Sequence, residues 1–159
     1  MITLDSSHLI QFLKEKGIDA QLQTETGQIY FSFKDDKREW PVFIRIYEDN
    51  GLMQALGFFP VQLQESTFAD TARLLHVFNK ELDIPGFGMD EDSKTAFFRC
   101  LLPTHGKRVH SELFWNMIST VKSVCEGFSQ AIEAIGVGAT TFLELTQQAV
   151  AMRAKDKGK

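Results

Sequence analysis

The sequence has few cysteines, few polar aromatic residues and no long apolar run. Only two of its 159 residues are cysteines, Cys100 and Cys125, and both fall in apolar segments, where a free cysteine packs as a small hydrophobic side chain. Nothing else indicates an oxidising compartment, so we expect no structural disulfide. No apolar run reaches the roughly 18 residues of a transmembrane helix. The first residues lack the features of a signal peptide, and we expect a cytoplasmic protein without a membrane span.

Positive charge is also scarce. The chain has 17 lysines and arginines against 21 aspartates and glutamates, which gives a formal net charge of −4. Proteins that bind nucleic acids use clustered basic side chains to displace counterions. No basic stretch before the C-terminus is longer than a pair such as Lys107-Arg108, and the lysines from 155 to 159 are typical of a solvated terminus. We therefore expect no nucleic-acid partner.

Residue patterns that carry chemistry are missing as well. No two of the four histidines have the four-residue spacing of a helical metal motif. The acidic run 90–92 lacks the alternating carboxylates, glycine and distant glutamate of a calcium loop. Segment 136–138 lacks the Lys-Ser/Thr of a phosphate-binding loop. Apolar neighbours would keep both cysteine thiols protonated and inert. The sequence thus predicts no catalytic residues, no metal and no cofactor.

The periodicity of apolar residues predicts one α+β domain with the element order α-βββ-α-ββ-α-α. Alternating residues indicate strands and 3.6-residue stripes indicate helices. We expect an antiparallel sheet of about five strands with helices on one face. Asp49-Asn50-Gly51 predicts a tight turn in the first group of strands. The predicted helices are 7–16, 67–82, 111–135 and 142–153, and the predicted strands are 29–33, 42–47, 52–59, 87–90 and 95–102.

The chain is expected to divide into a main domain, 1–136, and a C-terminal helical extension with a charged tail, 137–159. Thr141 with Glu144 matches a capping box and opens the last helix. The third helix, of about 25 residues, would span roughly 37 Å at 1.5 Å per residue. That is longer than a sheet of this size needs, so part of the helix is available to another chain.

The sequence is rich in one apolar aromatic residue, with 14 phenylalanines against two tryptophans and two tyrosines. Phe58-Phe59 and Phe97-Phe98 are adjacent pairs on predicted strands, and Leu101-Leu102 repeats the arrangement. Neighbouring side chains on a strand point to opposite faces, so one ring of each pair faces the helices and the other faces away. The second face must then be covered by the extra helix, by a dimer mate or by a client protein.

Segment 77–90, Val-Phe-Asn-Lys-Glu-Leu-Asp-Ile-Pro-Gly-Phe-Gly-Met-Asp, resembles the YbjN-like family, as do Phe98-Arg99 and Leu102-Pro103. This bacterial family shares its fold with the type III secretion chaperones, and the resemblance covers most of residues 5–136. It implies a small, acidic, cytoplasmic homodimer without enzymatic activity. Secretion chaperones of this fold bind the N-terminal part of an effector in extended form. The extension 137–159 looks longer than the usual chaperone end.

Three hypotheses follow. The first is a type III secretion chaperone-like protein that holds a client or effector segment partly unfolded, and the second is a YbjN-type regulator with the same fold and no secretion client. The third, an enzyme of unknown type, would need a polar pocket that the sequence does not indicate. The predicted partner-binding residues are the paired rings and the apolar stripe of the third helix: Phe58, Phe59, Phe97, Phe98, Leu101, Phe114, Ile118 and Val121.

Overall fold

The structure of the chain is a computed structural model that describes residues 1–47, 49 and 51–158. Its centre is a six-stranded sheet in which every pair of neighbours is antiparallel, in the order β2-β3-β4-β5-β7-β6. The strands of this sheet are β2 Gln21–Gln23, β3 Gln28–Lys34, β4 Glu39–Tyr47, β5 Leu52–Phe58, β6 Phe87–Asp90 and β7 Thr95–Pro103. The predicted α+β class is confirmed, with one more strand than the five expected.

The additional strand, β2, is short and leaves no clear pattern in the sequence. Its three residues pair with β3 at the edge of the sheet, and none of their side chains is fully buried. A second, two-stranded sheet pairs β1 (Ile2–Thr3) with β8 (Arg108–Val109). Pairs as short as this depend on the packing around them, so period-2 alternation could not reveal them.

The turns fall between the predicted strands. Between β3 and β4, a carboxylate oxygen of Asp35 accepts hydrogen bonds from the backbone N–H groups of Lys37 and Arg38, at 2.7 and 2.6 Å. These bonds, the Lys37 one first, lower the pKa of Asp35 below its usual value. At the predicted turn 49–51, Gly51 has the positive φ of +60° that glycine accommodates. Asn50 of that prediction lies outside the described residues.

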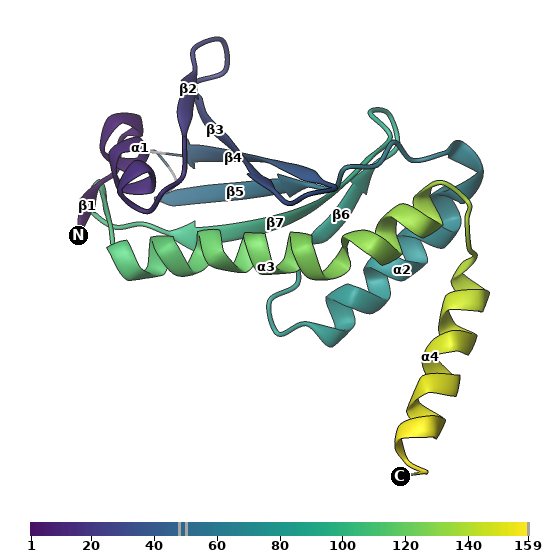
Figure 1. Ribbon diagram of the computed structural model, residues 1–159. Helices are drawn as coiled ribbons and strands as arrows, with labels where there is room; N and C mark the ends of the chain where they lie inside the picture. The colour runs from purple at the N-terminus through teal and green to yellow at the C-terminus, as the bar shows by residue number, and fades with distance from the viewer. Residues whose placement is uncertain (48, 50, 159) are drawn as a thin grey trace.

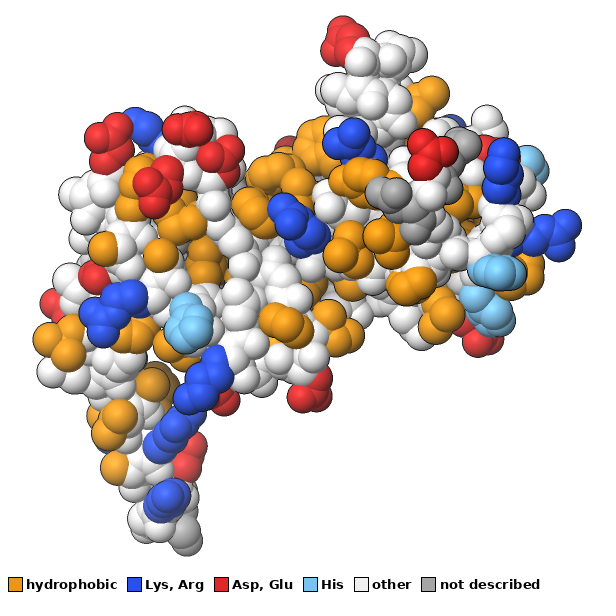
Figure 2. All heavy atoms as spheres, turned by 180° about the vertical axis from the view of Figure 1, so that it is seen from behind, with side chains coloured by type: hydrophobic (Ala, Val, Ile, Leu, Met, Phe, Trp, Pro, Cys, Tyr) orange, Lys and Arg blue, Asp and Glu red, His pale blue; other side chains and the backbone are white. Residues whose placement is uncertain are grey.

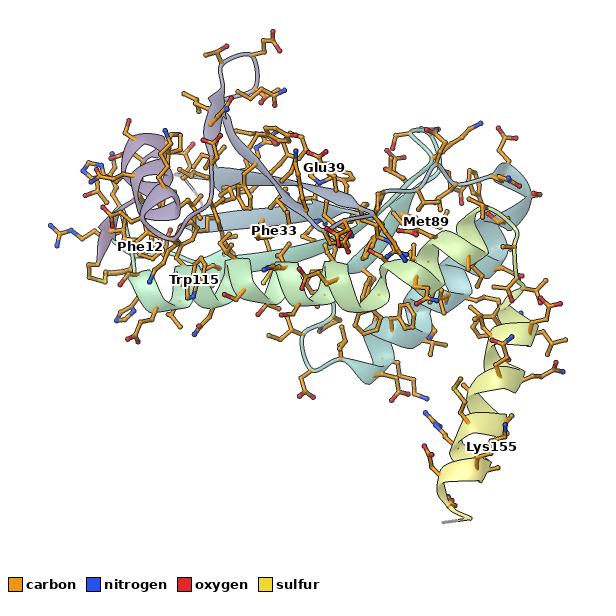
Figure 3. All side chains as sticks on the ribbon, in the orientation of Figure 1. Phe12, Phe33, Glu39, Met89, Trp115 and Lys155 are labelled. Atoms are coloured by element: carbon orange, nitrogen blue, oxygen red, sulfur yellow. The ribbon has the colours of Figure 1, made fainter. Side chains whose placement is uncertain are left out.

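Three helices cover one face of the sheet: α1 (Ser6–Glu15), α2 (Phe68–Glu81) and α3 (Ser111–Gly136) (Figure 1). A short 3₁₀ turn, η2 (Glu65–Thr67), precedes α2. The α3 helix runs along the length of the sheet, and α1 packs near its N-terminal end, where the Phe12 and Phe114 ring centroids are 5.6 Å apart. In this region the labelled side chains of Phe12 and Trp115 lie close together (Figure 3). The fourth helix, α4 (Phe142–Asp156), leaves the domain (Figure 1).

The core lies between α3 and the sheet. Trp40 of β4 is buried there, and its indole N–H donates a hydrogen bond of 2.6 Å to the hydroxyl of Ser129 on α3. At the edge of this core, Arg38 and Glu133 form an ion pair of 2.7 Å between the β3–β4 turn and the end of α3. The long helix is therefore held to the sheet by specific polar contacts as well as by apolar packing.

A glycine lets α3 approach the sheet closely. A Cβ atom at Gly57 of β5 would lie 2.8 Å from both the Cys125 sulfur and a Val121 methyl group. Because α3 lies directly on β5, the apolar side chains along one side of the helix are buried inside the domain. Phe114, Ile118 and Val121 are buried on this face. No partner can reach them while the chain is folded, which corrects their predicted role in partner binding.

Gly57→Ala is expected to destabilise the fold by about 1–3 kcal/mol, because the added methyl group must push α3 away from β5. Urea unfolding followed by circular dichroism measures the change. Gly127→Ala is the matched control: it lies on the exposed side of α3, with no atom within 4 Å of an added Cβ. It should stabilise the helix by about 0.5–1 kcal/mol. Equal effects of the two changes would contradict the close packing.

Candidate functional site: the open sheet face

The second face of the main sheet is uncovered in the described part of the chain. The helices α1, α2 and α3 lie on the opposite face, and α4 contacts α2 instead of the sheet (Figure 1). We call the uncovered surface the open face. It is formed by the side chains that alternate with the buried ones along the four central strands: Tyr30, Ser32, Pro41, Phe43, Arg45, Gln54, Leu56, Phe58, Phe97, Arg99 and Leu101.

Four aromatic rings form a continuous row across this face. The centroid distances are 5.1 Å from Tyr30 to Phe43, 5.8 Å from Phe43 to Phe58, and 6.2 Å from Phe58 to Phe97. The rings come one each from β3, β4, β5 and β7, which are neighbours in the sheet. Strands are spaced about 4.8 Å apart, so the row is roughly 14 Å long. A row of apolar rings of this length on a surface is typical of a site that contacts another molecule.

The end of the row is fixed by a glycine on the next strand. The Phe97 ring lies against Gly88 of β6, where an added Cβ would come within 2.7 Å of the ring. The Arg99 guanidinium carbon lies 5.3 Å from the centre of the same ring. The lack of a side chain at Gly88 thus gives Phe97 room to lie over the sheet and stay in the row.

A hollow of about 770 Å³ lies between the β2–β3 hairpin and Thr95 of β7, and three of the four rings, Tyr30, Phe43 and Phe58, line it. The hairpin protrudes from the sheet, and hydrophobic side chains gather below it on this side of the molecule (Figures 1 and 2). The hollow has a polar wall on the hairpin and an aromatic floor on the sheet. It is lined by Gln21, Leu22, Gln23, Thr24, Glu25, Tyr30, Pro41, Phe43, Phe58 and Thr95.

The structure confirms the predicted orientation of the paired residues. Phe59 and Phe98 are 3% and 0% exposed and point into the core, whereas Phe58 and Phe97 are half-buried on the open face. Leu101 is 54% exposed on the same face. A partner could therefore contact Phe58, Phe97 and Leu101, and the buried Phe59 and Phe98 leave the set of candidate contacts.

Sequence reasoning missed Tyr30, Pro41 and Phe43 as members of this surface. Their alternation with buried neighbours was visible, but it did not show which strands lie side by side. The register pairs Tyr30 with Phe43 and Phe58 with Phe97, and it is this pairing that joins the rings into one row. The site depends on strand order and register, which the local pattern does not contain.

Groups that could carry catalysis are not brought together in the described residues. No cluster of three or more histidine, cysteine or acidic side chains there could hold a metal ion. His8 is engaged locally, since its ring lies 2.7 Å from the carboxylate of Asp5, the residue that caps α1. Both cysteines are free and buried. Burial, with a smaller contribution from Glu126, raises the pKa of the Cys125 thiol to about 12, and burial also raises that of Cys100.

None of the described helices combines the length and the apolar character that crossing a membrane requires.

The fold defines the class of the molecule: a small α+β domain with a helix-covered sheet face and an open, aromatic one. The family model of YbjN, described as a putative bacterial sensory transduction regulator, matches residues 5–134. The chain belongs to the YbjN family, as the resemblance indicated.

Among solved structures, a chain in the crystal structure of the ExsC–ExsE complex has a similar fold. Its TM-score is 0.54 at 17% sequence identity, and the similarity covers 79% of this chain and 90% of that chain. The predicted secretion chaperone-like fold is confirmed. No curated protein matches the sequence.

We expect both thiols to resist alkylation by iodoacetamide at pH 8 in the folded protein and to react fully in urea. Because folding raises the pKa of Cys125 from 9.0 to about 12, its neutral thiol stabilises the fold below pH 9, and this contribution is lost as pH rises toward 12. The loss of stability in this range, measured by urea unfolding, should be smaller in Cys125→Ala than in the wild type. Labelling of the folded protein at pH 8 would show that the thiols are accessible.

Proposed function

We propose that the protein is a non-catalytic protein-binding module that holds an extended segment of a client protein on its open face. The observation that carries the proposal is the row of four rings from Tyr30 to Phe97, which no helix in the described part of the chain covers. Burying these rings against a partner would remove apolar surface from water, at about 25 cal/mol per Å².

The shape of the open face favours a polypeptide over a small molecule. A small-molecule site encloses most of its ligand in a closed pocket. Here the hollow takes in three of the four rings and opens across the sheet toward Phe97, so the surface is long and shallow. An extended segment can place alternate side chains in the hollow and along the row. Its ordering on binding would offset part of the free energy gained.

The family and the fold both support a protein partner. The family description names a regulator, and the structure with a similar fold is that of a complex between two proteins. On this basis the client is a segment that the protein keeps partly unfolded, as a type III secretion chaperone does. The homodimer implied by the resemblance is part of this proposal.

A regulatory role without a secretion client is the second candidate, and the family description favours it. The two roles differ in the state of the bound partner. A held client contributes one extended segment that digests readily when free, whereas a partner in a regulatory complex is bound as a folded domain. Cross-linking of native complexes followed by mass spectrometry separates them, because the linked peptides fall in one unstructured segment or on a folded surface.

The paired rings on β7 give a sharp test. Phe97→Asp should leave the fold intact, with a stability loss of about 1 kcal/mol from the ring contact with Phe58, and should abolish capture of the cross-linked partner. Phe98→Asp should unfold the domain, because a buried unpaired carboxylate costs several kcal/mol against a total stability of roughly 5–15 kcal/mol. Circular dichroism and native-complex mass spectrometry are the two readouts.

The control for this test is Leu113→Asp, an exposed apolar residue on α3 and away from the open face. It should keep both the fold and the partner. If Phe97→Asp captures the same partner as the wild type, the open face is not the binding surface.

A further inference from the structure

The α4 helix is well formed but almost unsupported. Its N-terminus is closed by a capping box, in which the Thr141 hydroxyl accepts from the Glu144 N–H at 3.2 Å and the Glu144 carboxylate accepts from the Thr141 N–H at 2.8 Å. Only its first turn is anchored: the Phe142 N–H donates to Asp70 of α2 at 3.1 Å, and Arg73 stacks on the Phe142 ring at 4.3 Å. No residue of α4 is buried.

The helix projects away from the domain, so that the labelled Lys155 lies far from every other element (Figures 1 and 3). Helices of about 15 residues are marginally stable in water when nothing packs on them. Yet α4 exposes three large apolar side chains, Leu143, Val150 and Met152, which are 64%, 67% and 69% exposed. Leu143 and Val150 lie on one side of this projecting helix and Met152 on the other, and the exposed apolar pair on one side indicates a missing partner.

One side of α4 has a shape that complements itself. Leu143, Thr146, Val150 and Ala154 recur at spacings of three and four residues, so they share one side of the helix. We call this side, together with Ala151, the α4 seam. A hollow of about 350 Å³ lies along it, lined in part by the small side chains of Ala151 and Ala154. The seam therefore has a large side chain near its start and a hollow that extends from Thr146 to Ala154.

The two ends of α4 differ in charge. Glu144 in the first turn and Asp70 of α2 outweigh the nearby Arg73 at the helix start, whereas Arg153, Lys155 and Lys157 outweigh Asp156 at the other end. A second α4 running antiparallel would bring each acidic end to a basic end, and the two helix dipoles would also oppose each other favourably. It would place Leu143 of each copy over the Ala151–Ala154 hollow of the other. A parallel helix would place like charges together and leave both hollows empty.

We propose that the α4 seam docks a second copy of this chain, as an antiparallel pair of α4 helices related by a two-fold axis near the middle of the helix. This is an isologous contact, in which each copy offers the same surface. The inference rests on the homodimer of the proposed function and assigns it a surface that the resemblance does not supply. The family match ends at residue 134, so the seam lies outside the part of the chain shared with the family.

The contact is expected to be weak. A pair of four-turn helices buries less than the roughly 1,200 Å² of a typical stable interface. Dimers should therefore form reversibly in the micromolar range or above, and added salt should weaken them because the paired helix ends are exposed.

Sedimentation equilibrium of the full chain between about 1 and 500 μM tests the seam. The wild type should associate, and Leu143→Gln with Val150→Gln should weaken association at least about tenfold, since two apolar side chains leave the contact. Glutamine favours helix as well as either residue, so α4 should persist. Leu113→Gln, at an α3 position that is 52% exposed, is the matched control and should associate as the wild type does.

The outcomes separate the two proposals. A wild type that stays monomeric at every concentration overturns both the homodimer and the seam. A wild type that associates equally well after both α4 changes overturns the seam alone. Neither result affects client binding, which is read separately with Phe97→Asp.

Disulfide trapping tests the antiparallel arrangement. Two variants, Leu143→Cys and Ala154→Cys, are oxidised separately and as a mixture, and the products are separated by non-reducing electrophoresis. The native thiols are buried and should not compete. The seam predicts a cross-linked dimer only in the mixture, because the two positions in one helix are about 16 Å apart. Dimers from each variant alone would indicate parallel helices, and no dimer in any sample would place the contact elsewhere; either result overturns the proposal.

Discussion

The architecture depends on one close contact, in which α3 lies directly on β5 because Gly57 carries no side chain. This contact lets a single long helix, helped by α1 and α2, satisfy the apolar side chains of one sheet face. The Trp40–Ser129 hydrogen bond and the Arg38–Glu133 ion pair then hold the C-terminal part of the helix against the sheet. With α1, α2 and α3 on that face, α4 is the remaining α-helix among the described residues, and it turns away from the sheet.

The open face is thus a consequence of how the helices are distributed. A sheet of this kind with polar residues on its outer face would need no further explanation. Here the outer positions of four adjacent strands each carry an aromatic ring, and the rings stay within 6.2 Å of their neighbours. The glycine at position 88 on the neighbouring strand keeps the last ring in this row. A partner bound to this face would bury the rings, whereas in the isolated chain they leave apolar surface exposed to water.

Local patterns in the sequence predicted the elements and the two-faced character of the strands, because alternation at Phe58-Phe59 and Phe97-Phe98 requires one ring on each side. They could not predict which rings would meet, since Tyr30 and Phe43 become neighbours only through the register between β3 and β4. They also assigned the stripe of α3 to a partner. The length of the helix suggested that part of it was free for a partner. How closely α3 packs on the sheet depends on Gly57, which lies 57 or more positions earlier in the chain than the stripe that packs on it.

The open face and the α4 seam are separate surfaces, so both could be occupied at the same time. The open face lies on the side of the sheet away from α2 and α3, whereas α4 extends from the helical side (Figures 1 and 2). A dimer that joins through α4 would leave both open faces accessible, so each copy could hold a segment of one client. Linking two weak sites in this way raises the effective affinity for a long segment without any new contact. A dimer that buried the rings themselves would lose that advantage, because the copies would compete with the client for the same apolar row.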